Sequence, residues 1–180
     1  MSNQTYLFVS SVGKFEESVG LVSCTFMELD KKSENGRLYR FEDAEQIIET
    51  LIGSPIRYGI NWLGKHLEGS ETREVGFVES AELIGKKVVG SIRITSKDIL
   101  SKIKSGVKFL LSVGGKAGMV LKKGFVEMIN PKVEHVQLFP TSQGEAGFSS
   151  AKVEKILEIE ESVLYAGSNT LALLTALELI

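Results

Sequence analysis

Short apolar runs separated by glycines dominate the chain, a pattern typical of β-strands joined by tight turns. Gly85-Lys86 lies between two such runs as in a hairpin loop, and Asn130-Pro131 interrupts a third. The pattern predicts seven strands: Tyr6–Val12, Val19–Leu29, Glu74–Leu83, Lys87–Ile94, Val107–Val113, Met119–Met128 and Val133–Phe139.

Other segments carry apolar residues every three or four positions, as an amphipathic helix does. This spacing predicts three helices: Asp43–Ile52, Ser96–Ser105 and Ser150–Tyr165. Gly53 and Gly106 follow the first two and are typical of helix ends. A last helix from Ser168 or Asn169 to the end would be apolar on more than one face. We therefore expect it to be buried against its own domain or a partner chain.

Composition narrows the class of protein. The chain has 180 residues, is 43% hydrophobic and carries a net charge of −2, so one ordinary globular domain is expected and no positive field attracts nucleic acid or an anionic membrane. Its one cysteine, Cys24, excludes an internal disulfide, and no Cys/His spacing indicates a metal site. We expect no cofactor, no secretory signal and no membrane-spanning segment.

Two histidines and one serine are candidates for chemistry. His66 lies between a predicted helix and a predicted strand, where a loop could present a catalytic base. His135 lies inside a predicted strand, and a second imidazole would be a suitable partner for it. Ser112 is followed by Gly114 and Gly115, which could leave its hydroxyl and nearby amides accessible. Taken singly, each histidine also fits a surface or core residue, and the serine fits a strand end before a Gly-Gly turn.

Taken in order, His66, Ser112 and His135 resemble the catalytic set of the prohead (capsid maturation) protease superfamily, which is related to the herpesvirus assemblins. Their separations are 46 residues (112 − 66) and 23 residues (135 − 112). Asn35-Gly36-Arg37-Leu38-Tyr39 resembles the Asn-x-Arg-x-Tyr signature of that family, and His135 to Pro140 resembles its closing strand. The resemblance extends over about residues 19 to 148.

The resemblance implies an α+β fold, mainly an antiparallel β-barrel of about six to seven strands with flanking helices. Residues 1–150 would form the protease domain, and residues 151–180 a helical segment that packs on the barrel or on a partner chain. Ser112 would be the nucleophile, His66 the general base and His135 its supporting partner. Glu134 competes with His135 for the third role, and strand alternation allows at most one of them. Candidates for the oxyanion hole are the amides of Val113, Gly114 and Gly115.

The implied function is a Ser-His-His serine endopeptidase that processes scaffold protein, capsid protein and itself, inside an assembling phage procapsid in the host cytoplasm. A homo-oligomer through the C-terminal helices is expected, with neither nucleic acid nor membrane as partner. Three alternatives stay open: a catalytically silent assembly protein with the protease fold, a β-barrel binding module, and a cysteine hydrolase. The last is disfavoured because Cys24 lies in an apolar strand pattern, typical of a buried small side chain.

Overall fold

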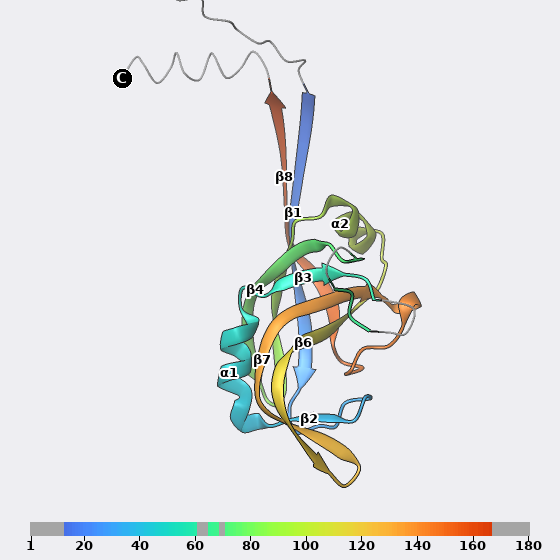
Figure 1. Ribbon diagram of the computed structural model, residues 1–180. Coiled ribbons are helices and arrows are strands. Elements are labelled where there is room, and N and C mark those ends of the chain that lie inside the picture. The colour runs from blue at the N-terminus through green and yellow to red at the C-terminus, as the bar shows by residue number, and fades with distance from the viewer. Residues whose placement is uncertain (1–12, 61–64, 69–70, 167–180) are drawn as a thin grey trace, which may run out of the picture.

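The structure, a computed structural model, describes residues 13–60, 65–68 and 71–166 and forms a closed β-barrel (Figure 1). Seven strands close the ring in the order β7-β3-β4-β5-β1-β8-β6, because β6 pairs back with β7, and β2 is added outside the ring on β7. Among the strand pairings of these described residues, only β2–β7 and β3–β7 are parallel. The strands are β1 (Gly13–Glu28), β2 (Arg37–Tyr39), β3 (Pro55–Tyr58), β4 (Glu74–Ile84), β5 (Lys87–Ile94), β6 (Phe109–Lys122), β7 (Phe125–Pro140) and β8 (Lys152–Ala166).

In the described residues two short α-helices flank this barrel, and the predicted α+β, mainly antiparallel barrel is therefore confirmed. Helix α1 (Ala44–Leu51) packs against β7 and β4, and α2 (Lys97–Lys104) packs against β1 and β5 (Figure 1). Both lie where their apolar spacing predicted them. Gly53 and Gly106 follow them at φ values of +81° and +89°, a backbone region in which a residue with a Cβ would be strained.

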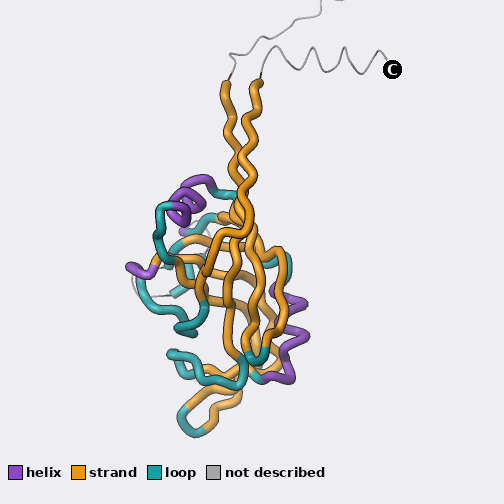
Figure 2. The backbone as a smooth tube through the Cα atoms, turned by 180° about the vertical axis from the view of Figure 1, so that it is seen from behind, coloured by secondary structure: helices purple, strands orange, loops and turns teal. Residues whose placement is uncertain are grey.

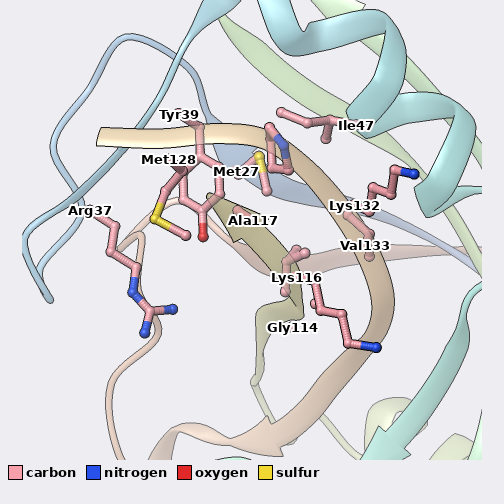
Figure 3. Close-up of a pocket in the computed structure, with 13 residues that line it drawn as sticks. Met27, Arg37, Tyr39, Ile47, Gly114, Lys116, Ala117, Met128, Lys132 and Val133 are labelled. Carbon is pink, nitrogen blue, oxygen red and sulfur yellow. The ribbon is translucent and has the colours of Figure 1, made fainter. Parts of the chain in front are cut away.

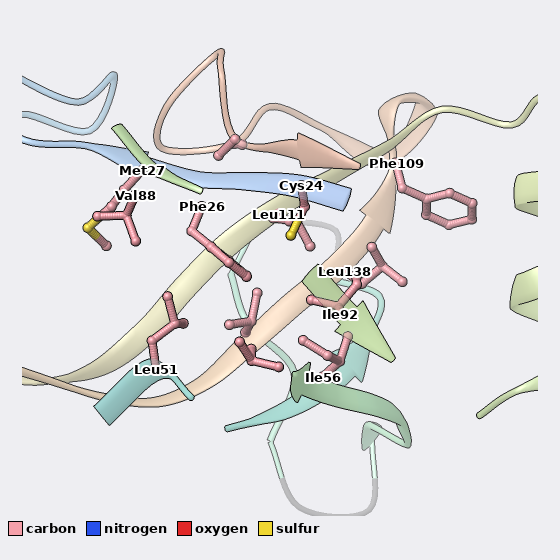
Figure 4. Packing of buried hydrophobic residues seen from close by; sticks show 14 of the residues in the cluster. Cys24, Phe26, Met27, Leu51, Ile56, Val88, Ile92, Phe109, Leu111 and Leu138 are labelled. Carbon is pink, nitrogen blue, oxygen red and sulfur yellow. The ribbon is translucent and has the colours of Figure 1, made fainter. Parts of the chain in front are cut away.

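The core fills the barrel interior with side chains from many strands. Phe26, Leu111, Leu138, Ile56 and Ile92 come from five different strands and lie within this cluster (Figure 4). All five are at most 1% exposed. Because each strand alternates between the interior and the outside, this packing fixes which residues of β6 and β7 can face outward into a site.

Cys24 belongs to the same core, at 2% exposure. Burial, with a smaller contribution from Glu154, raises the pKa of its thiol far above the usual range. A thiol that stays protonated is a poor nucleophile. The alternative of a cysteine hydrolase therefore has no support in the structure.

The helix predicted over Ser150–Tyr165 is wrong, because this segment forms strand β8. Two bulges in its pairing with β1 leave Glu154 and Leu157 unpaired. Apolar residues at every third position of β8 therefore pair with residues at every second position of β1. The pairs are Val153 with Cys24, Ile156 with Val22, and Ile159 with Gly20. A doubly bulged strand thus imitates helical periodicity.

The boundaries predicted around the β6–β7 hairpin are also wrong. The structure has one long β6 in place of Val107–Val113 and the start of Met119–Met128, and one long β7 that includes Val133–Phe139. The strands turn at Lys123-Gly124, with Gly124 at φ +85°, and not at the two glycines after Ser112. Asn130-Pro131 does not end the strand; Asn130 adopts φ +47° at an irregularity inside β7.

Beyond the barrel, β1 and β8 continue as a two-stranded ribbon that projects away from it (Figures 1 and 2). The predicted strand Tyr6–Val12 and the predicted last helix lie outside the described residues. The strands β2 and β3, of three and four residues, were not predicted because they are too short to show a period. No helix in the described part of the chain is long and apolar enough to cross a membrane.

Candidate active site

Ser112 lies near the start of β6, opposite Gln137 of β7. Its neighbours Phe109 and Leu111 are buried in the core, so alternation turns the Ser112 side chain to the other face of the strand. There the residue is half-buried. The serine therefore projects from a rigid strand and not from the turn that the sequence suggested.

His66 reaches the serine from the connection between β3 and β4. This connection leaves the barrel at Gly59, whose N–H donates to the Leu138 carbonyl (2.7 Å) and whose carbonyl accepts from the Gln137 side-chain amide. Ile60 then forms a bridge with His66 itself. Two hydrogen bonds thus fasten the start of the loop to β7. The bridge with Ile60 keeps the main chain of His66 close to this attachment at Gly59.

The three predicted residues lie in one hydrogen-bonded line. His66 Nε2 is 2.8 Å from Ser112 Oγ, and His66 Nδ1 is 2.7 Å from His135 Nε2. The two imidazole rings meet edge to face, with centroids 4.9 Å apart. When the Ser112 hydroxyl donates to Nε2 of His66, Nε2 is unprotonated and Nδ1 of the same ring carries the N–H. That N–H then donates to Nε2 of His135.

Glu134 has a different partner from His135. Its carboxylate accepts from Lys116 Nζ (2.8 Å) at an exposed position. The pairing shows why: Gly114 faces His135 and Gly115 faces Val133, so Glu134 is the extra residue of a bulge in β7. A bulge changes the direction of neighbouring side chains. Of the two residues that competed for the third position, His135 is the one that the structure places beside His66.

Both imidazoles are held in their neutral form. Burial lowers the pKa of His66 to about 4, with further lowering by His135, Arg37 and Arg57. Burial, followed by Arg57, also lowers the pKa of His135, while Glu134 and Glu68 oppose this shift. A neutral His66 has the free electron pair that a general base needs, although a base with so low a pKa accepts a proton weakly.

Gly114 provides the space in which the histidines lie. A Cβ built on Gly114 would lie 2.7 Å from His66 Nδ1 and closer still to the ring of His135. Gly115 has a different constraint, because a Cβ there would meet the main-chain carbonyl of Lys132. Gly114 thus allows the histidine side chains to come close to β6, and Gly115 allows the main chain of β7 to do so. The two glycines do not form a turn.

Two of the three candidate main-chain amides are suitably directed for an oxyanion hole. The Leu111 N–H donates to the Ala151 carbonyl (2.9 Å), away from β7. Because successive residues of a strand direct their main-chain groups to opposite edges, the Val113 N–H also points away from β7, and the Gly114 N–H points toward it. By this alternation Val113 and Gly115 are both directed toward the open edge of β6, and Val113 is the one next to Ser112.

The serine and both histidines open on a cleft of about 590 Å³. Its far walls are the segments 33–37 and 145–148, which the Glu34 N–H links by donating to the Gly147 carbonyl (2.9 Å). Tyr39 and Phe148, whose ring centroids are 6.2 Å apart, also line it. A smaller hollow adjoins it, lined by Arg37, Tyr39 and Met128 among others (Figure 3).

Sequence reasoning did not identify the residues that hold this arrangement. Gln137 is fully buried and acts through Gly59, 78 positions away along the chain, so no local pattern indicates the contact. Arg37 was noted only as part of a family signature, and it lines the cleft. Among the described residues, no group of three or more His, Cys, Asp or Glu side chains could hold a metal ion.

Comparisons with known proteins find similarity at the level of structure. No family model and no curated protein sequence matches this chain. The solved structure of the capsid assembly protease of bacteriophage T4 matches 72% of this chain and 98% of its own, with a TM-score of 0.46 and 13% sequence identity. A likeness this distant does not decide the chemistry of the site, for which the side-chain geometry is the evidence.

Proposed function

We propose that this chain is a serine endopeptidase in which Ser112 is the nucleophile, His66 the general base and His135 the residue that orients His66. The observation that carries the proposal is the continuous line from Ser112 Oγ to His66 (2.8 Å) and from His66 to His135 (2.7 Å) at the edge of a cleft. A hydroxyl in contact with an imidazole that a third group orients is the arrangement of an activated nucleophile.

The reaction would be acyl transfer. Ser112 Oγ attacks the peptide carbonyl while His66 Nε2 takes the hydroxyl proton, and the Val113 amide donates to the developing oxyanion. The new imidazolium donates from Nδ1 to the neutral His135 Nε2. His66 then returns the proton to the leaving amine, and water hydrolyses the acyl ester. A neutral imidazole supports the positive charge less than a carboxylate would, so we expect a slow enzyme.

The narrower role rests on the order of the sequence motifs. The resemblance to prohead proteases supports scaffold protein, capsid protein and the chain itself as substrates, with cleavage inside an assembling procapsid in the host cytoplasm. The cleft accords with a peptide substrate, because it is open and bordered by a strand edge. The predicted oligomer relied on two C-terminal helices. The segment of the first forms strand β8, and the second lies outside the described residues.

A fluorophosphonate probe tests the nucleophile directly. The Ser112 oxygen should bond to phosphorus with loss of fluoride, while His66 takes the proton, and mass spectrometry of the digested protein should find the adduct on Ser112. The denatured chain is the control and should show no preference among its serines. Absence of an adduct on Ser112 after prolonged exposure to the probe, or an equal spread of adducts in the folded chain, would contradict the proposal.

The low pKa of His66 predicts an unusual pH profile. The neutral form is the active base, and protonation inactivates it. Because burial places this pKa at about 4 and not at its ordinary value of 6.5, kcat/KM should stay level from neutral pH to about pH 5.5 and fall below that. Initial rates between pH 3.5 and 8, with circular dichroism to confirm folding, measure it. A half-maximal rate near pH 6.5 would show that His66 is not the buried base.

A further inference from the structure

Within the part of the chain that the structure describes, the edge of β6 that faces away from β7 is unpaired over most of its length. Among the described residues, β6 pairs with β8 only at Leu110 and Lys152, whereas its pairing with β7 continues to Lys122 and Phe125. An open strand edge offers unpaired N–H and C=O groups to another extended chain. This edge begins at the cleft beside Ser112 and continues to the end of the hairpin that projects below the barrel (Figure 1).

Large apolar side chains cluster at the far end of the same edge. Met119, Val120 and Leu121 on β6 and Ile129 on β7 are all exposed, and Leu121 (83%) and Met119 (68%) are the two most exposed large apolar side chains of the described part. Such a concentration of exposed apolar surface indicates a binding surface. Met119 and Leu121 lie on one face of the hairpin, opposite Met128 and Val126.

This face is continuous with the candidate active site. Met128, the partner of Met119, also lines the small hollow beside Gly114 (Figure 3). The apolar end of the hairpin, the hollow and the cleft therefore form one path along β6. A chain bound at Ser112 in an extended form has its next residues along this path.

We propose that the open edge of β6 and the apolar hairpin face, defined by Met119 and Leu121, bind the extended polypeptide substrate at a distance from the cut bond. The substrate adds a strand to β6, and its apolar side chains pack on Met119 and Leu121. These residues are seven and nine positions beyond Ser112, so they engage substrate residues roughly seven to nine positions from the scissile bond, since paired strands advance together. This inference rests on the proposed function and adds the substrate class: an unfolded segment with an apolar patch at that distance.

The test compares long and short substrates. Randomised synthetic 24-residue peptides are incubated with the full chain, cut bonds are identified by mass spectrometry, and one cleaved peptide is shortened to four residues on each side of its cut. The wild type should cleave the long form with a kcat/KM about tenfold higher, equal to about 1.4 kcal/mol. The double variant Met119→Ser/Leu121→Ser should lose this advantage and cleave both forms at the rate of the short one.

Ile84→Ser is the matched control, because Ile84 is also an exposed apolar residue (60%) at the end of a hairpin, between β4 and β5. It should behave as the wild type. Equal rates on long and short peptides in the wild type, or an unchanged long-peptide advantage in the double variant, would overturn the inference. So would a loss that affects both peptides equally, or a change of oligomeric mass, which would assign the face to a second copy of the chain.

Fluorophosphonate labelling separates this inference from the function on which it rests. The double variant should label at Ser112 as fast as the wild type, because neither substitution contacts the histidines. If labelling persists while the long-peptide advantage is absent, the inference fails alone. If the wild type neither labels at Ser112 nor cleaves any peptide, the proposed function fails and the inference with it.

Discussion

Replacing Ser112 with alanine is expected to lower kcat/KM for a cleaved peptide by about ten-thousand-fold or more. The substitution removes the oxygen that is hydrogen-bonded to His66 Nε2, so the proposed covalent intermediate cannot form. The hydroxyl is half-buried and alanine fits in its place, so the free energy of unfolding should change by only about 1 kcal/mol. Peptide cleavage and thermal unfolding of the same sample measure the two effects.

Other substitutions serve as controls for this result. Ser23→Ala removes the hydroxyl of a half-buried β1 residue, which donates to the Lys155 carbonyl, and should leave cleavage unchanged. His66→Ala should be nearly as damaging as the loss of Ser112, while His135→Ala should cost less, because it acts through His66. Cleavage by Ser112→Ala at the wild-type rate would leave the silent assembly protein as the better hypothesis. A larger loss in His135→Ala than in His66→Ala would reverse the assigned roles.

The parts of the fold that followed from sequence are those with a clear local signal. The hairpin of β4 and β5 lies where it was predicted, since Gly85 adopts φ +61° at its turn. The two helices were equally clear, because glycines follow both of them. Strand β8 was missed for a physical reason: its bulges shift the pairing by one residue each, and the interval between its inward residues becomes three.

In the site, too, the sequence indicated the residues but not the contacts between distant segments that hold them. The order of Ser112 and the two histidines was sufficient to name them as a set, and the structure brings them within hydrogen-bonding distance. What holds them was not predictable from the chain, because the buried contact of Gln137 with Gly59 joins elements far apart in sequence. The hydroxyl also lies on a strand and not on a turn, so the glycines after it needed a different explanation.

Gly114→Ala tests that explanation and is expected to lower kcat by about a hundredfold with only a small change in stability. The new methyl group would lie 2.7 Å from His66 Nδ1 and closer to the His135 ring, so both rings must move by roughly 1 Å to restore van der Waals contact. A displacement of that size is sufficient for a loss of about a hundredfold, because proton transfer needs the Ser112–His66 hydrogen bond. Fluorophosphonate labelling should slow by a similar factor.

Gly118→Ala is the matched control on the same strand. A Cβ at Gly118 would meet Ile129 at 3.4 Å, an ordinary contact distance, so the methyl group fits without moving the histidines. Comparing the two variants separates the loss of backbone freedom, which they share, from the collision with the imidazoles, which only Gly114→Ala produces. If Gly114→Ala and Gly118→Ala both kept wild-type kcat, the histidines could not be packed over Gly114 during the reaction. An equal loss in both variants would instead assign the effect to the backbone of β6, because only the position of the histidine rings distinguishes the two sites.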